Sequence, residues 1–156
     1  MIEEQQNREN TQKKHKKVML VGRSECGKTT LIQALERRSI QYEKTQVIGF
    51  SKKMIDTPGE YMQIPNFGRA LAIYAYETDV IAFLASAVED YCVFSPNIVP
   101  HVNREVVGVV TKCDLPGSYP DTVAGWLRNA GCKKIFKVSA YTGEGVDELR
   151  EYLFNN

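Results

Sequence analysis

The sequence predicts an α/β fold in which a doubly wound, mostly parallel sheet is flanked by helices. Three observations support this prediction. Short apolar runs of strand type alternate with segments in which apolar residues recur at helical spacing. Residues 80–84 and 106–110 are continuous apolar stretches, which is typical of strands that a parallel sheet buries on both faces. The first strand-like run leads directly into a glycine-containing loop and then into a helical segment.

The strands are predicted from apolar or β-branched runs that end at turn residues. Asp56 follows the third run at a turn that contains Pro58 and Gly59, and these residue types stop regular structure. Pro96 and Pro100 allow only a short or broken helix between the fourth and fifth strands. In chain order, the predicted strands are residues 17–21, 46–51, 53–55, 79–85, 105–110 and 134–138.

Helices are predicted where apolar residues recur every three or four positions. The first covers residues 30–38, the second runs from a cap at Asn66 to Tyr76, the third ends at Gly131, and the last is C-terminal. We expect Trp126 to pack in the core rather than contact a ligand. The predicted apolar faces contain Leu31, Ala34, Leu35, then Ala70, Leu71, Ile73, Tyr74, then Val123, Trp126, Leu127, Ala130, and finally Val146, Leu149 and Leu153.

The chain has 156 residues, of which 43% are hydrophobic and 25% are charged, as expected for a globular domain. We expect residues 1–16 to be a disordered charged tail, because they lack the apolar stripe of a targeting or docking helix, and residues 17–156 to form a single domain. The net charge of +1 gives no reason to expect a nucleic acid or membrane partner. No apolar run approaches the roughly 20 residues that span a bilayer, so we expect a cytoplasmic protein.

The four cysteines, at positions 26, 92, 113 and 132, are widely spaced and contain no C-x-x-C pair. We therefore expect reduced thiols rather than a zinc site or a disulfide framework. Cys26 has two interpretations. A thiol at a helix N-terminus near Lys28 could have a lowered pKa and be open to oxidation. The interpretation that we favour is a loop residue that matters through its backbone.

The clearest motif lies at residues 22–29, which match the phosphate-binding pattern G-x-x-x-x-G-K-[ST] at every fixed position. Gly22 and Gly27 let backbone N–H groups approach a phosphate from several sides. Lys28 brings a positive charge to the β- and γ-phosphates, and Thr29 offers a hydroxyl to Mg²⁺. The predicted phosphate contacts are Gly22, Arg23, Ser24, Glu25, Cys26, Gly27, Lys28 and Thr29, which form the phosphate loop, together with Thr30.

Residues that follow other strands point to the same end of the sheet, where open α/β sheets bind their ligands. Asp56 can hold Mg²⁺ through its carboxylate, and Gly59 can donate its backbone N–H to a γ-phosphate. An ordinary turn containing Asp, Pro and Gly explains these residues equally well. Ser139 and Ala140, after the last strand, can offer backbone N–H groups to the O6 atom of guanine.

Residues 111–114, Thr-Lys-Cys-Asp, follow the next-to-last strand and discriminate between bases. A carboxylate accepts hydrogen bonds from N1–H and the exocyclic amine of guanine, whereas adenine presents an acceptor at N1. Asp114 therefore indicates guanine, while Lys112 can lie along the base plane and Thr111 can brace this base loop. A polar turn that enters residues 116–117 is the structural alternative.

The order of these motifs resembles the small GTP-binding proteins of the P-loop NTPase class over about residues 17–154. The sequences at 44–46, 55–61 and 111–116, and the short span between Lys28 and Asp56, resemble the EutP/PduV family of ethanolamine and propanediol utilisation. This resemblance implies a compact GTPase-like protein associated with bacterial microcompartment pathways, with shell proteins or pathway enzymes as partners. It also implies an alternative, because some members are linked to acetate kinase activity with ATP.

Our leading hypothesis is a switch that binds GTP or GDP with Mg²⁺, hydrolyses GTP slowly and rearranges residues 39–46 and 57–65 when the γ-phosphate leaves. Thr45 is the candidate switch threonine, and its structural alternative is a β-branched residue that starts a strand. Glu60 stands where many GTPases carry glutamine, and an ionised carboxylate beside a polyanion is unfavourable. The predicted catalytic set is Lys28, Thr45, Gly59 and Glu60, and the predicted metal ligands are Thr29, Thr45 and Asp56.

Two other functions stay open. A kinase would pass the γ-phosphoryl group of ATP to acetate or a related acceptor, for which Arg23, Arg69 and His101 are loose candidates. We expect Arg23 to face solvent and His101 to be an exposed loop residue. A non-catalytic scaffold would bind its partners through exposed tyrosines, although we expect core or rim positions for these side chains. The tyrosines concerned are Tyr61, Tyr74, Tyr76 and Tyr91.

Overall fold

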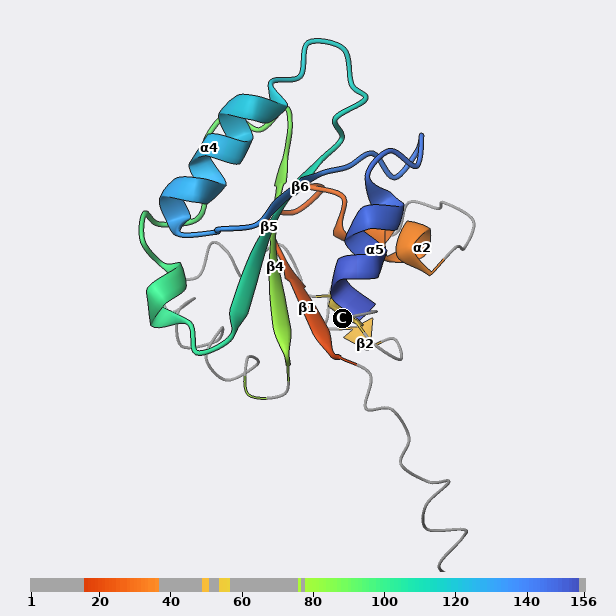
Figure 1. Ribbon diagram of the computed structural model, residues 1–156. Coiled ribbons are helices and arrows are strands. Elements are labelled where there is room, and N and C mark those ends of the chain that lie inside the picture. Colours follow the sequence, from red (N-terminus) through yellow and green to blue (C-terminus); the bar gives the residue numbers. More distant parts are fainter. Residues whose placement is uncertain (1–15, 37–48, 51–53, 57–75, 77, 155–156) are drawn as a thin grey trace, which may run out of the picture.

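A computed structural model of the chain describes residues 16–36, 49–50, 54–56, 76 and 78–154 (Figure 1). Two predictions lie almost entirely outside the described residues. Of the predicted tail, residues 1–16, only residue 16 is described, and of the predicted helix from Asn66 to Tyr76 only Tyr76 is described. The strands are β1 (Val18–Val21), β2 (Gly49–Phe50), β3 (Met54–Asp56), β4 (Val80–Ser86), β5 (Glu105–Thr111) and β6 (Ile135–Lys137). The helices are α2 (Lys28–Leu35), α4 (Pro120–Ala130), α5 (Val146–Phe154) and the short 3₁₀ helix η2 (Val99–His101).

The strands form one sheet in the order β2-β3-β1-β4-β5-β6. The pairs from β3 to β6 are parallel, and only the β2–β3 pair at the edge is antiparallel. The predicted mostly parallel, doubly wound sheet is therefore confirmed. Because β1 lies between β3 and β4, the carboxyl ends of these three strands lie side by side at one edge of the sheet.

Helices cover both faces of the sheet, with α4 on one face and α2 and α5 on the other (Figure 1). The strand residues alternate accordingly, as the two-residue period of a strand requires. Met19 and Ile81 belong to the core cluster that contains the buried residues of α4. Val18 and Val80, one position earlier on the same strands, belong to the cluster that contains Leu31 of α2 and the apolar residues of α5.

Glycines in the left-handed conformation set the start of α2 and the end of α4. Helix α2 begins at Lys28, two residues before its predicted start, because Gly27 adopts a left-handed conformation (φ 100°) at the N-cap. Helix α4 begins with Pro120 in its first turn and ends where Gly131 takes a left-handed conformation (φ 113°), as the predicted stop required. Trp126 of α4 is partly buried against the core and makes an edge contact with Tyr119.

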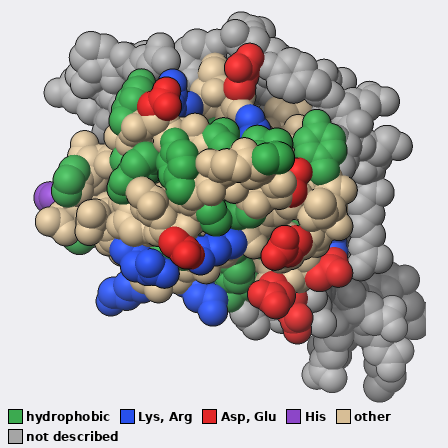
Figure 2. All heavy atoms as spheres, turned by 90° about the horizontal axis from the view of Figure 1, so that it is seen from above, with side chains coloured by type: hydrophobic (Ala, Val, Ile, Leu, Met, Phe, Trp, Pro, Cys, Tyr) green, Lys and Arg blue, Asp and Glu red, His purple; other side chains and the backbone are tan. Residues whose placement is uncertain are grey.

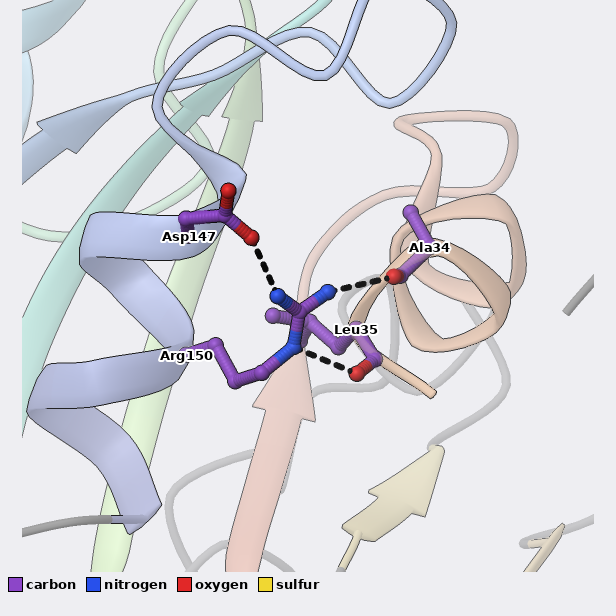
Figure 3. A network of polar contacts seen from close by, with 4 residues as sticks. All are labelled: Ala34, Leu35, Asp147 and Arg150. Atoms are coloured by element: carbon purple, nitrogen blue, oxygen red, sulfur yellow. Dashed lines mark hydrogen bonds and ion pairs between the residues drawn. The ribbon is translucent and has the colours of Figure 1, made fainter. Parts of the chain in front are cut away.

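Helix α5 fastens the C-terminal end of α2 through one arginine (Figure 3). The Arg150 guanidinium donates to the backbone carbonyls of Leu35 and Ala34, at 2.8 Å each, and forms an ion pair with Asp147. Carbonyls at the end of a helix lack partners within the helix, so Arg150 satisfies two acceptors that would otherwise rely on solvent. It thereby fixes the helix that begins in the phosphate loop.

We expect Arg150→Met to lower the free energy of unfolding by about 1–3 kcal/mol, because the methionine keeps an apolar stem but cannot donate to the two carbonyls. Urea denaturation measures this loss. The matched control is Arg128→Met, at an exposed position of α4, where a change within about 0.5 kcal/mol is expected. Equal losses in the two variants would contradict a fastening role for Arg150.

Candidate functional site

The phosphate loop connects β1 to α2 at the carboxyl edge of the sheet and depends on two glycines. A Cβ atom at Gly22 would lie 2.7 Å from the Leu84 carbonyl oxygen and 2.7 Å from the Cys26 Sγ atom, so a side chain cannot be accommodated there. Gly27 has a φ of 100°, which L side chains rarely adopt. The first position therefore allows a close approach to β4, and the second turns the chain into the helix.

Lys28 is almost completely buried, with 6% of its surface exposed. Its Nζ atom donates to the carbonyl oxygens of Gly22 at 2.9 Å and Arg23 at 3.0 Å. Because a buried ammonium group needs such partners, these bonds fix the charge within the loop. The positive end of the α2 dipole lies at the same place. The arrangement is thus electrostatically prepared for an anion.

The base loop, residues 111–114, is fastened to the phosphate loop by two side chains. The buried Thr111 hydroxyl donates to the Cys26 carbonyl, and the Lys112 Nζ atom donates to the Glu25 carbonyl. Glu25 (φ 65°) and Lys112 (φ 59°) both adopt the left-handed conformation that is uncommon outside glycine. Two segments 85 and 87 residues apart are therefore held together through strained backbone positions.

Asp114 lies exposed at the end of the base loop, where a neighbouring loop orients its carboxylate. The Ser139 hydroxyl donates to the Asp114 Oδ1 atom at 2.8 Å. The Ser139 N–H does not face a ligand as predicted, because it donates to the Glu144 carbonyl at 2.9 Å and thereby closes the loop after β6. Within the described part of the chain, the Ala140 N–H has no such partner. Of the two N–H groups predicted to donate to guanine O6, only that of Ala140 is still a candidate.

Arg23 does not simply extend into solvent, as was expected from the sequence. Its guanidinium lies over the ring of Tyr91, 4.6 Å from the ring centroid. Tyr91 itself is 54% exposed, on the segment that follows β4. This contact joins the phosphate loop to a third segment at the carboxyl edge of the sheet.

The thiol of Cys26 points into the protein and is buried. Burial raises its pKa above the ordinary value, and the nearby positive charge of Lys28 opposes this effect only in part. The interpretation of Cys26 as a thiol with a lowered pKa is therefore wrong, because its helix N-terminus is a desolvated position. The side chain fills the space under Gly22, while its carbonyl accepts the bond from Thr111.

One residue at this edge was not predicted. Glu89 follows β4 by three positions and is only 7% exposed. Its Oε1 atom accepts a hydrogen bond from the Ser86 N–H at 3.1 Å. The only sequence signal was an acidic residue shortly after a continuous apolar strand, which an exposed turn would also explain.

Other predicted site residues are placed differently. Asp56 is the last residue of β3 and pairs with Leu20 of β1, one position before the end of the strand that leads into the phosphate loop. His101 is exposed in η2, which precedes the amino end of β5 and so lies away from the phosphate loop (Figure 1). The exposed position expected for His101 is confirmed, and this residue does not lie beside the phosphate loop. Residues Thr45, Gly59, Glu60, Tyr61, Arg69 and Tyr74 lie outside the described residues.

The described part of the carboxyl edge carries hydrophobic, basic and acidic side chains. In the view onto this end of the sheet, hydrophobic side chains lie among basic and acidic ones (Figure 2). The exposed aromatic side chains in the described part of the chain include Tyr76, Tyr91 and Tyr141. Tyr76 (85% exposed) and Tyr91 are thus surface residues rather than core residues.

No helix in the described ranges is long and apolar enough to cross a membrane.

Comparison with known proteins identifies relatives over nearly the whole chain. Residues 15–155 match the model of a family described as ethanolamine utilisation - propanediol utilisation, PduV-EutP. The propanediol utilization protein PduV of Citrobacter freundii is 42% identical over 139 residues, which are 88% of this chain and 93% of the relative. A protein of Escherichia coli K12 named "Probable acetate kinase EutP" is 28% identical over 88% of this chain and 89% of its own length.

Solved structures agree on the fold. A crystal structure of Era in complex with MgGDPNP and a fragment of 16S ribosomal RNA matches with a TM-score of 0.59 and 22% identity. The match covers 88% of this chain and 55% of Era. A structure of Aquifex aeolicus Era bound to GDP.AlF4- gives the same TM-score and identity. The predicted P-loop NTPase fold is therefore confirmed, and this chain corresponds to about half of the length of Era.

The cysteines allow a test of the burial described above. Burial, with a smaller contribution from Cys92, raises the pKa of Cys132 to about 12, and burial raises the pKa of Cys26 as well. Because only the thiolate reacts, alkylation of both residues between pH 7 and 9 should be much slower in the folded protein than in urea. Site-resolved mass spectrometry measures the rates. Rapid labelling of Cys26 in the folded protein would restore the interpretation of a reactive thiol.

Proposed function

Because this chain belongs to the PduV-EutP family of ethanolamine and propanediol utilisation, we propose that it is a Mg²⁺-dependent GTP-binding switch that hydrolyses GTP slowly. The observation that carries the proposal is the joint fixation of the two loops. Thr111 and Lys112 bond to carbonyls of the phosphate loop, while Ser139 orients Asp114. A nucleotide needs such a fixed separation between the groups that contact its base and those that contact its phosphates.

Guanine is the base that the base loop favours. The Asp114 carboxylate can only accept hydrogen bonds. The Ser139 hydroxyl uses one acceptor site, on Oδ1, so sites are left for two N–H donors of a ligand. Guanine supplies both donors at N1 and the exocyclic amine, whereas adenine presents an acceptor at N1. The Ala140 N–H supplies the donor to O6. Adenine therefore loses at least one hydrogen bond and leaves a carboxylate unpaired.

The phosphates are assigned to the phosphate loop, with Lys28 as the principal cation and the first N–H groups of α2 as further donors. Mg²⁺ fits this donor set, because Thr29 supplies a hydroxyl in the first turn of α2 and Asp56 ends a strand that pairs with β1. When bound, Mg²⁺ would neutralise charge on the β- and γ-phosphate oxygens. Thr45 is proposed as a further ligand.

Catalysis and switching are assigned to residues outside the described ranges, together with Lys28. Gly59 is proposed to donate its N–H to the γ-phosphate, and Glu60 to make hydrolysis slow because its carboxylate repels the anionic phosphates. The rearranging segments are residues 39–46 and 57–65. We place this activity in the cytoplasm in association with a bacterial microcompartment, where shell proteins or pathway enzymes would be its partners. The support for this placement is the family membership.

A second candidate function is supported by the relatives named as an acetate kinase. In that case the same phosphate loop would hold ATP, and the γ-phosphoryl group would pass to an acetate oxygen while ADP leaves. The described residues favour the switch, because Arg23 is engaged with Tyr91 and His101 lies away from the loop. Neither is available as an acceptor contact in this arrangement.

Titration with GDP, GTP and ATP in Mg²⁺, followed by measurement of phosphate release with and without acetate, distinguishes the two functions. We expect guanine nucleotides to bind at least about tenfold more tightly than ATP, or about 1.4 kcal/mol, with slow release that is independent of acetate. Lys28→Ala should abolish binding, whereas Lys133→Ala, at an exposed lysine, should not. ATP preference with acetate-dependent turnover would establish the kinase instead.

The base assignment has a test of its own. We expect Asp114→Asn to weaken GDP binding by about 10–100-fold, because the amide cannot accept from both guanine donors, and to improve binding of xanthosine diphosphate. Competition against a fluorescent nucleotide measures both affinities. The matched control is Asp121→Asn, at an exposed aspartate on α4. An unchanged ratio of GDP to xanthosine diphosphate affinity would remove Asp114 from base recognition.

A further inference from the structure

The segment that follows β4 carries a buried carboxyl group beside the phosphate loop. Residues 87–91 are held by hydrogen bonds to two other parts of the chain. The Ala87 N–H donates to the Thr111 carbonyl at 2.8 Å, and the Tyr119 hydroxyl donates to the Glu89 carbonyl. The Tyr119 N–H donates to the Ala87 carbonyl at 2.9 Å. The position of Glu89 is therefore set by the sheet edge and by the residues that precede α4.

The carboxyl group of Glu89 is only half satisfied. Its Oε1 atom accepts from the Ser86 N–H, but its buried Oε2 atom has no hydrogen-bond partner among the described residues. Leaving one oxygen of an ionised carboxylate buried and unpaired is costly. A protonated carboxyl group would reduce that cost, because it no longer carries a full charge.

Three positively charged side chains favour the ionised form of Glu89, and all three belong to the proposed nucleotide site. Arg23 and Lys28 in the phosphate loop and Lys112 in the base loop are near enough to act electrostatically on the Glu89 carboxyl group. The other titratable neighbours are Cys26 and Cys92, whose pKa values are raised and whose thiols are therefore neutral, and the Tyr119 hydroxyl, which bonds to the backbone. Burial is the largest influence and raises the pKa of Glu89, while the three cations limit the rise.

We propose that Glu89 is a positioning residue that takes up a proton when the phosphates of a nucleotide occupy the phosphate loop. This inference rests on the proposed nucleotide function and adds a regulation to it. Bound phosphates carry net negative charge even with Mg²⁺, and they engage Lys28, one of the cations that stabilise ionised Glu89. With that stabilisation reduced and a like charge nearby, the neutral carboxyl group is favoured. Binding thus becomes coupled to pH.

The sign of the coupling follows from linkage. Nucleotide binding raises the pKa of Glu89 further, so the bound protein holds more protons than the free protein between the two pKa values. Affinity is highest when Glu89 is protonated in both states, and it falls as pH rises from the pKa of the free protein through that of the complex. A shift of about one pKa unit corresponds to about a tenfold loss of affinity across this window.

Titration of the wild type and of Glu89→Gln with MgGDP from pH 5 to pH 8.5 tests the inference. Glutamine keeps the acceptor for Ser86 and stays neutral, so Glu89→Gln should bind about tenfold more tightly than the wild type at high pH and equally at low pH. Comparing the two proteins cancels the protonation of the nucleotide itself. Glu151→Gln, at an exposed glutamate of α5, should follow the wild-type profile.

The wild type provides a second readout that does not depend on how the variant folds. Calorimetry in two buffers of different ionisation enthalpy, with excess Mg²⁺, should show uptake of up to about one proton per GDP within the window. Absence of uptake, or identical pH profiles for the wild type and Glu89→Gln, overturns the role of Glu89 while leaving the nucleotide function intact. Failure of all these proteins to bind any nucleotide overturns both.

Discussion

The site depends on two hydrogen bonds from the base loop to carbonyls of the phosphate loop. Thr111, buried at the end of β5, donates to Cys26, and Lys112 donates to Glu25. Both bonds join segments that follow different strands, so they form only when β1, β4 and β5 are in register. The left-handed backbone at Glu25 and Lys112 is strain that this fixation maintains. The fold thereby sets the distance between the proposed base and phosphate contacts.

Several charged side chains at this edge of the sheet make no ion pair within the described part of the chain. Among the described residues, the buried Lys28 ammonium group bonds to the carbonyl oxygens of Gly22 and Arg23 and to the Cys26 thiol. Arg23 is occupied by the ring of Tyr91, and Glu89 is buried without an ion pair in the described part of the chain. An anion would engage these cations more strongly than the carbonyls do, because charge-assisted contacts are the stronger ones. The site is thus electrostatically suited to phosphate.

The sequence was sufficient to predict the fold, because strand period, helical spacing and turn residues agreed along the chain. It also indicated the phosphate loop and the base loop as candidate sites, and the structure joins these two loops by hydrogen bonds. It failed where tertiary packing decides. Cys26 has the local environment of a reactive thiol, yet the close approach of Gly22 to β4 buries it. The stacking of Arg23 on Tyr91, the burial of Glu89 and the use of the Ser139 N–H inside its own loop arise from contacts between distant segments.

The most direct test of this account is a crystal structure of the protein grown with GDP and Mg²⁺. The expected result is a nucleotide whose diphosphate contacts the phosphate loop and Lys28, and whose guanine N1 and exocyclic amine donate to Asp114. The bonds from Thr111 and Lys112 to the phosphate loop should be retained. A nucleotide bound elsewhere, or a guanine ring that does not contact the Asp114 carboxylate, would contradict the claim that the two loops form one guanine nucleotide site.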